Sequence, residues 1–185
     1  MASPETRPPA RARILEAAHD LFYRDGIRAT GIDRVIAASD VAKLTFYRHF
    51  PSKDALVLAF LDDRHERWMA WFESALARHG GTAEALAPAL RDWFKSRDFR
   101  GCAFLNSVAE YGGHDARVRK LAARHKRAMA QAIARLLPAG PARSAKADAL
   151  ALAADGAIVR ASYAASPKAA LAPLALLVAR LCAQD

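Results

Sequence analysis

The stretch TGIDRVIAASDVAKLTFYRHFPSKD, residues 30–54, decides the fold that this sequence predicts. Its apolar side chains recur at helical spacing in two short runs, which the Ser-Asp-Val triplet at residues 39–41 separates as a turn. The first run predicts a two-turn helix that ends at the residue before this turn. The second predicts a helix over residues 42–49, because Pro51 disfavours helical backbone at the residue before it. Two short helices joined by a tight turn are typical of a helix-turn-helix unit, here residues 31–50.

The predicted helix over residues 42–49 has one apolar and one polar face. A helix that reads DNA is anchored by apolar residues on one side and presents polar side chains to base edges and phosphates on the other. Between residues 42 and 53 the chain carries three bases and no acid. The apolar contacts are expected from Val35, Ile36, Val41, Phe46 and Phe50. The side chains expected to face outward or into the crevice are Lys43, Thr45, Tyr47, Arg48 and His49.

Two lysines lie at predicted helix starts. Lys43 opens the second short helix, and Lys53 opens a long helix that Ser52 is expected to cap. Their ammonium groups would lie beside backbone N–H groups without partners inside the helix, an arrangement that favours phosphate. Thr30, with Asp33 three residues later, is expected to cap the first short helix.

The remaining chain is also predicted to be helical, because no segment shows the alternating β-branched pattern of a strand. Gly26 is expected to end the first helix in a left-handed conformation. Pro88 and Pro173 either kink their helices or mark the first turn. The fold class is therefore all-α, with about nine helices. Besides the two short ones, helices are expected at residues 11–25, 53–79, 82–96, 102–111, 116–137, 143–165 and 166–182.

Composition places the chain among soluble globular proteins, with 53% hydrophobic and 25% charged residues. Its apolar stretches are far shorter than the roughly 20 residues that span a bilayer, and residues 1–13 lack the apolar core of a signal peptide. We therefore expect a cytoplasmic protein with no membrane partner. Cys102 and Cys182 are expected to be reduced thiols, and no spacing predicts a metal or a cofactor.

The net charge of +9 is unevenly distributed. Residues 1–55 carry 9 basic and 7 acidic side chains, a net +2, whereas residues 56–185 carry 19 and 12, a net +7. Bulk charge alone would therefore point away from the predicted helix-turn-helix. The densest basic run, residues 117–127, is interpreted as a solvated helix face.

In and around the predicted helix-turn-helix, the chain resembles the tetracycline-repressor-like (TetR) family of bacterial regulators. The resemblance runs from Ile14 to Leu56 and includes the segments ILEAA at residues 14–18 and TFYRHF at residues 45–50. It implies a ligand-responsive repressor that binds a palindromic operator in double-stranded DNA as a homodimer and is released by an unknown small molecule. It also implies DNA contacts from Thr30, Lys43, Thr45, Tyr47, His49 and Lys53.

The resemblance also implies a division into two domains. Residues 1–52 are expected to form an N-terminal arm and the helix-turn-helix DNA-binding domain. Residues 53–185 are expected to form a helical domain for effector binding and dimerisation. A looser similarity, around residues 100–106 and in the helix after His114, points to the same role for this second part.

Three residues depart from the family pattern. Asp40 replaces a glycine in the turn, which is tolerable because Asp can adopt the left-handed conformation. Ala42 replaces a serine cap, at a cost of about 1 kcal/mol in helix stability. Leu44 replaces a glycine, so an apolar contact, for example with a thymine methyl group, is expected there in place of close backbone approach.

Aromatic side chains follow the long helix at helical spacing. Such a stripe is ordinarily core packing, and this alternative stays open. The functional alternative is a ligand pocket with apolar walls and a few polar groups. Its candidate residues are His65, Trp68, Phe72, Phe94, Phe104, Asn106, Glu110, His125 and Tyr163.

Small residues on the predicted helix 143–165 would let another helix approach closely. Within one chain this would be ordinary packing, but with the last helix it could form a two-fold interface between copies. The candidate interface residues are Ala153, Gly156, Ala157, Ala161, Leu174, Leu177, Val178 and Leu181.

Two other functions remain as alternatives. A small helical enzyme would use Cys102 with His114 or His125, or Glu110 as an acid or base, and a catalytic cysteine needs a base within hydrogen-bond reach. For a helical interaction module that does not bind DNA, Lys43→Ala would leave DNA affinity unchanged. Neither alternative has a supporting motif, so we expect no enzymatic activity.

Overall fold

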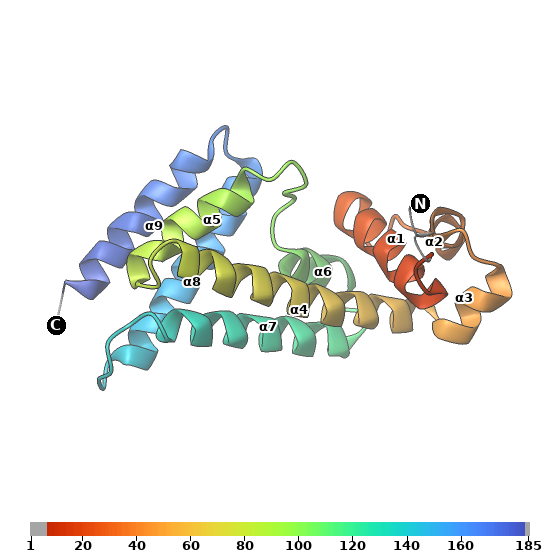
Figure 1. Cartoon of the computed structure of the whole chain (residues 1–185), viewed down its shortest axis with the longest axis horizontal. Helices are drawn as coiled ribbons and strands as arrows, with labels where there is room; N and C mark the ends of the chain where they lie inside the picture. The colour runs from red at the N-terminus through yellow and green to blue at the C-terminus, as the bar shows by residue number, and fades with distance from the viewer. Residues whose placement is uncertain (1–6, 184–185) are drawn as a thin grey trace, which may run out of the picture. The chain divides into compact units, whose positions relative to one another are not determined.

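The computed structural model describes residues 7–183, and in this part of the chain every regular element is helical (Figure 1). It contains nine α-helices and one 3₁₀ turn, which confirms the all-α prediction. The chain divides into two compact units. Among the described residues, unit 1 comprises residues 7–64 and 106–121, and unit 2 comprises residues 65–105 and 122–183. Residues 1–6 of the predicted arm lie outside the described residues.

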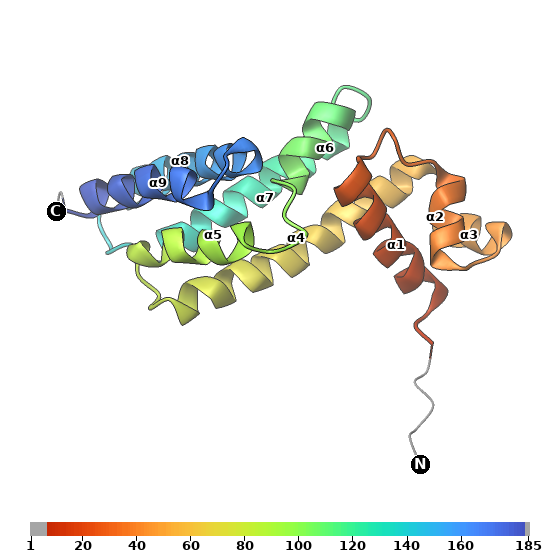
Figure 2. The ribbon, with the colours of Figure 1, turned by 90° about the horizontal axis from the view of Figure 1, so that it is seen from above.

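Unit 1 begins with three helices that contact one another (Figure 2). They are α1 (Ala10–Asp25), α2 (Ile32–Ser39) and α3 (Lys43–His49). The first part of α4 (Lys53–Arg78) packs against α1, where the Phe60 ring lies edge-on to Phe22 with centroids 5.5 Å apart. This buried apolar core positions the two short helices.

Unit 1 also contains most of α6 (Ala103–Tyr111) and the start of α7 (Ala116–Ala134). Unit 2 contains the 3₁₀ turn η1 (Ala83–Ala85) and three further helices. These are α5 (Leu86–Phe94), α8 (Arg143–Tyr163) and α9 (Pro167–Cys182), which pack side by side in Figures 1 and 2. None of the helices in the described chain is long and apolar enough to cross a membrane.

The observed boundaries agree with most of the predicted ones. The helix predicted over residues 82–96 is instead the short turn η1 followed by α5, so Pro88 is the third residue of α5, where its missing N–H costs no helical bond. Pro173 lies inside α9. Ser52 caps α4 as predicted, since its Oγ accepts the Ala55 N–H at 3.1 Å.

Candidate functional site

The short helix α3 presents a largely exposed face. Its two phenylalanines anchor it, because Phe46 is fully buried and Phe50 is 3% exposed. On the other side Leu44 is 65% exposed and Tyr47 is 40% exposed, although both are large side chains that would ordinarily be covered. Arg48 and His49 are also exposed. The helix therefore holds a row of accessible polar and apolar side chains on a rigid apolar base.

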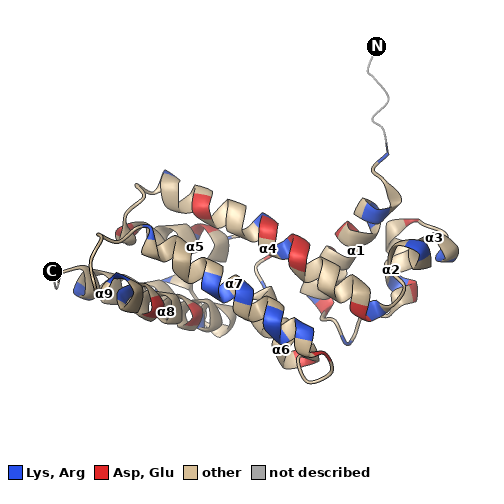
Figure 3. Ribbon diagram, turned by 90° about the horizontal axis from the view of Figure 1, so that it is seen from below, with Lys and Arg blue, Asp and Glu red and all other residues tan. Residues whose placement is uncertain are grey.

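Basic residues occur on α3, where the ribbon is blue in Figure 3. Lys43 is exposed, and its Nζ lies 3.5 Å from Asp33 Oδ1 on α2, so only a weak surface ion pair holds it. Thr45 is partly exposed. Lys53 is also partly exposed. Its partial burial lowers the pKa of its ammonium group below the usual value, and the negative charges of Glu110 and Asp54 offset only part of this decrease.

The turn between α2 and α3 depends on Asp40. This residue has φ 50° and ψ 55°, the left-handed conformation that the sequence predicts for it. Its carboxylate accepts a hydrogen bond from Arg7, and Arg13 Nη1 lies 3.8 Å from the same oxygen. The sequence does not reveal this pairing, because Arg7 and Arg13 lie about 30 residues away and no local spacing connects them to the turn.

Thr30 corrects two predictions. The N-cap of α2 is Gly31, and no side chain caps it, so Thr30 does not open the helix. The Thr30 side chain is fully buried, and its hydroxyl donates to the Gly26 carbonyl at 2.7 Å. A hydroxyl in this position has no access to a phosphate. Thr30 therefore supports the site from inside rather than contacting a ligand.

The turn between α1 and α2 is held by α6. The Arg28 backbone N–H donates to Glu110 Oε2 at 3.1 Å, and Glu110 lies directly against Gly26. From the sequence, Glu110 is expected in a ligand pocket or in acid-base chemistry. The structure instead places its carboxylate on the backbone that leads into the helix-turn-helix.

A second contact inside unit 1 joins α6 to the start of α4. The Tyr111 hydroxyl donates to Asp54 Oδ1 at 2.5 Å, and His114 Nε2 lies 3.4 Å from Asp54 Oδ2. Burial, followed by this bond to Asp54, raises the pKa of Tyr111 to about 12. The phenol therefore stays protonated and remains a donor to Asp54 throughout the physiological pH range.

Unit 2 contains a cluster of rings that includes most of the predicted pocket residues. Its histidines pair, with His65 Nδ1 3.1 Å from His125 Nδ1, so one nitrogen donates and the other accepts. The His125 ring stacks on Phe104 at 3.8 Å between centroids. Trp68 stacks on Phe72 at 4.7 Å. Further ring contacts extend the cluster through Trp71, Trp93, Phe94 and Phe99.

Trp68 Nε1 is a buried donor with no hydrogen-bond partner among the described residues. A buried polar group without a partner loses its hydration without replacement, which makes this N–H unusual. Tyr163, assigned to the interior by sequence analysis, is 73% exposed, because it ends α8 on the outer face. Asn106 is an exposed residue of unit 1.

The predicted interface residues divide into two groups. Ala157, Leu174 and Val178 are buried within this chain, so they cannot meet a second copy without repacking. Gly156 and Leu177 are exposed, and Ala153, Ala161 and Leu181 are intermediate. The large exposed apolar residues of these helices are Leu152, Val159, Tyr163, Leu176 and Leu177.

Cys102 is buried, and neither Cys102 nor Cys182 forms a disulfide within the part of the chain that the structure describes. Residues 7–183 also contain no group of three histidine, cysteine or acidic side chains that could hold a metal ion.

Three comparisons relate the chain to known proteins. The sequence model described as "Bacterial regulatory proteins, tetR family" matches residues 14–60. The HTH-type transcriptional regulator UidR of Escherichia coli is 32% identical over 68 residues. The HTH-type transcriptional repressor Rv3405c of Mycobacterium tuberculosis is 39% identical over 100 residues. The match to UidR covers 37% of this chain and 35% of UidR. The match to Rv3405c covers 49% of this chain and 52% of Rv3405c, so the chain spans about half or less of these relatives' length.

A solved structure extends the similarity to nearly the whole chain. SCO4454, a TetR-family transcriptional regulator from Streptomyces coelicolor, is 32% identical, with a TM-score of 0.80. The match covers 94% of each chain. The chain therefore belongs to the TetR family of helix-turn-helix transcriptional regulators.

Proposed function

We propose that the chain binds a palindromic operator in double-stranded DNA as a homodimer, with α3 in the major groove, and represses transcription until a small molecule releases it. The exposed face of α3 carries this proposal, because Leu44 and Tyr47 are accessible while Phe46 and Phe50 fix the helix from behind. Major-groove recognition requires such a short, anchored helix with side chains free to reach base edges.

Within this proposal the residues have different roles. Lys43 and Lys53 contact phosphates, as does Arg48, while Tyr47 and His49 reach the groove and Leu44 provides an apolar contact. Thr45 is partly exposed and contributes a hydroxyl. The domain division is also part of the proposal: residues 1–52 bind DNA, and residues 53–185 pair and bind the effector.

The experiment is an unbiased selection of bound sequences from a random DNA pool, followed by gel shifts on the selected duplex over a salt series. We expect a palindromic consensus. Tyr47→Ala should weaken specific binding by roughly tenfold or more, and Lys43→Ala should lower the salt slope by about 1. Arg127→Ala, an exposed cation on α7, is the matched control. No sequence preference, or unchanged affinity in both α3 variants, would favour an interaction module that does not bind DNA.

The dimer interface that we propose is the exposed apolar stripe of α8 and α9. On α8 the residues Leu152, Gly156, Val159 and Tyr163 share one face at helical spacing, opposite the face that this chain buries. Contiguous exposed apolar surface of this kind ordinarily marks a contact with another molecule. On a palindromic operator, the two recognition helices of such a dimer would lie about 34–36 Å apart, one turn of DNA.

The effector site that we propose is the ring cluster of unit 2, and the buried Trp68 N–H favours it. A flat aromatic ligand with one acceptor atom would satisfy this donor. Release from DNA follows if the ligand prefers the conformation that does not bind the operator.

Quinoline and naphthalene make a matched pair of probes for this site, since they share a shape but only quinoline accepts a hydrogen bond. Quinoline should raise the melting temperature of the wild type more than that of Trp68→Phe, whereas naphthalene should not distinguish them. Equal responses of both proteins to quinoline would argue against this site.

A further inference from the structure

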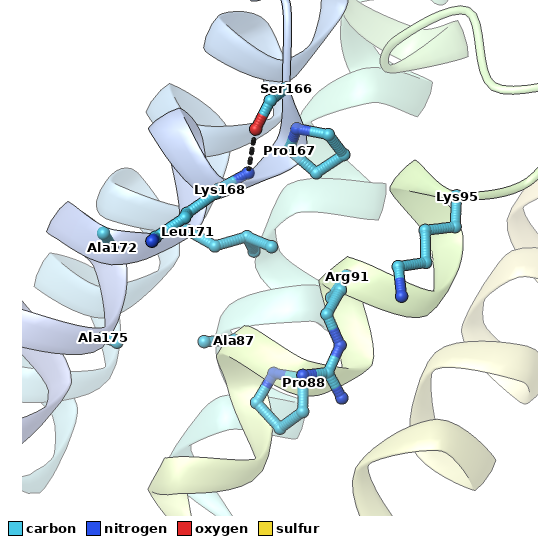
Figure 4. Close-up of a pocket in the computed structure, with 10 residues that line it drawn as sticks. All are labelled: Ala87, Pro88, Arg91, Lys95, Ser166, Pro167, Lys168, Leu171, Ala172 and Ala175. Carbon is cyan, nitrogen blue, oxygen red and sulfur yellow. Dashed lines mark hydrogen bonds between the residues drawn. The ribbon is translucent and has the colours of Figure 1, made fainter.

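Unit 2 has an open cavity of about 530 Å³ that lies apart from the ring cluster, between α5 and the first turns of α9. Its size falls within the usual range of small-molecule sites. Figure 4 shows Ser166 and Pro167 at one end, α5 along one side and α9 along the other. We propose that this groove binds an amphipathic carboxylate, with its apolar part between the helices and its carboxylate at the α5 edge.

The walls between the helices are apolar. Ala87 and Pro88 line the groove from α5, and Leu171 and Ala175 line it from α9, with the Leu171 side chain directed toward α5 in Figure 4. Such a surface favours an alkyl or aryl group, because contact removes apolar area from water on both sides. A highly charged ligand such as a polyphosphate would gain nothing from these walls.

The polar lining has a single sign of charge. Arg91, Lys95 and Lys168 line the groove, and no acidic residue does. None of these three side chains forms an ion pair with any described residue. Arg91 and Lys95 lie one helical turn apart on the α5 edge, and Figure 4 shows the Lys95 ammonium directed toward Arg91, while Lys168 runs along α9 toward Ala172. Two neighbouring cations without a counter-charge repel each other, and an anion between them removes that repulsion.

The carboxylate is the anion that this pair fits. The guanidinium of Arg91 matches a carboxylate with two parallel hydrogen bonds, and Lys95 adds a point charge. Ser166 adds a hydroxyl at the end of the groove. Its Oγ accepts the Lys168 N–H at 3.1 Å as the cap of α9, which leaves its own hydrogen available to a ligand oxygen.

The groove and the proposed dimer interface use largely different parts of α9. Leu171 and Ala175 lie on one flank of the buried residue Leu174, and Leu177 lies on the opposite flank, whereas Ala172 of the groove lies one turn before Leu176. Pairing through the exposed face of α8 and Leu177 would therefore leave the Leu171 flank accessible to a ligand. The proposal is also independent of DNA binding, since none of its residues belongs to unit 1.

The test is calorimetric titration of the full chain with decanoate, decanol and decylamine, three probes of equal chain length that differ in charge. We expect saturable binding of decanoate, weaker binding of decanol and the weakest binding of decylamine. The double variant Arg91→Gln with Lys95→Gln should weaken decanoate binding by roughly tenfold or more, because it removes both cations. Arg127→Gln, which removes an exposed cation from α7, should leave decanoate affinity unchanged.

Two further variants locate the bound decanoate. Ala175→Trp should abolish binding by filling the groove, whereas Trp68→Phe should leave it unchanged. The proposal is overturned if decanoate does not bind saturably, if the double variant binds it as well as the wild type does, or if Trp68→Phe removes binding. Gel shifts without decanoate should be identical for the wild type and the double variant, so failure at the groove is distinct from failure to bind DNA.

Discussion

Gly26 begins the turn between α1 and α2, the first helix of the helix-turn-helix. It follows α1 with φ 89° and ψ 156°. The positive φ agrees with the sequence prediction, but the ψ value is not that of the left-handed helical region, so the predicted conformation is only half right. Backbone in this region is essentially restricted to glycine. A Cβ at this position would also lie 2.8 Å from Glu110 Oε2.

Gly26→Ala should therefore lower the free energy of unfolding by about 1–3 kcal/mol, the usual cost of a strained backbone conformation. The Glu110→Ala background should reduce this cost but not remove it, because the backbone strain persists without the carboxylate. Urea unfolding of the four proteins in the cycle measures both contributions. Gly113→Ala is the control, since nothing lies within 4 Å of its added Cβ and its φ is not in the positive range. Equal stability of Gly26→Ala and Gly113→Ala would contradict the prediction.

Single residues were predictable where their role is local. The left-handed Asp40 follows from its place in a tight turn, and the burial of Phe46 follows from the amphipathic spacing of its helix. The role of Thr30 was not predictable in the same way. Its hydroxyl can either cap the helix that follows or donate to the carbonyl of Gly26 before it, and the sequence spacing permits both hydrogen bonds. Glu110 finds its partner 82 residues away, which no local pattern contains.

The helices α3 and α4 differ in how they begin. The side chain of Ser52 caps α4, whereas α3 starts after Ala42, which has extended backbone geometry and no side chain to accept a bond. The first N–H groups of α3 therefore have no side-chain acceptor. This is the stability cost that the sequence predicts for alanine at the cap.

Ala42→Ser should raise the free energy of unfolding by about 1 kcal/mol, because its hydroxyl would accept an N–H from the first turn of α3. Ser52→Ala should lower it by a similar amount. Ala38→Ser is a matched control: it makes the same substitution near the end of α2, where serine lowers stability by a few tenths of a kcal/mol. Denaturant unfolding would measure all three, and a decrease for Ala42→Ser would show that the cap geometry is not available.

Helix positions were predictable where a helix buries one face at a period of 3.6 residues and a glycine or proline follows it, as Gly26 follows α1 and Pro51 follows α3. The division of residues 82–96 into η1 and α5 was not, since a 3₁₀ turn and a first α-helical turn share the same apolar spacing. The choice of face also failed for Ala157 on α8 and for Leu174 and Val178 on α9. Both helices are apolar on more than one side, and periodicity does not indicate which side this chain covers itself.

For the assembled protein, the exposed α8 residues Leu152 and Val159 provide the decisive test. Replacing both with Glu places two like charges on each copy at the proposed interface, and their burial without partners would be strongly unfavourable. The double variant should sediment as a monomer where the wild type sediments as a dimer. Ser144→Glu, at the exposed start of α8, should leave the dimer intact.

The monomer should also lose most of its affinity for the selected palindrome, although every residue of α3 is unchanged. A dimer places its second recognition helix at a high effective concentration over the second half-site, and a monomer loses this advantage. Gel shifts on the full palindrome and on a single half-site separate the two effects: the variant should bind both duplexes with similar, weak affinity. A double variant that stays dimeric would place the interface elsewhere. A monomer with undiminished affinity for the palindrome would show that a single α3 helix is sufficient for recognition.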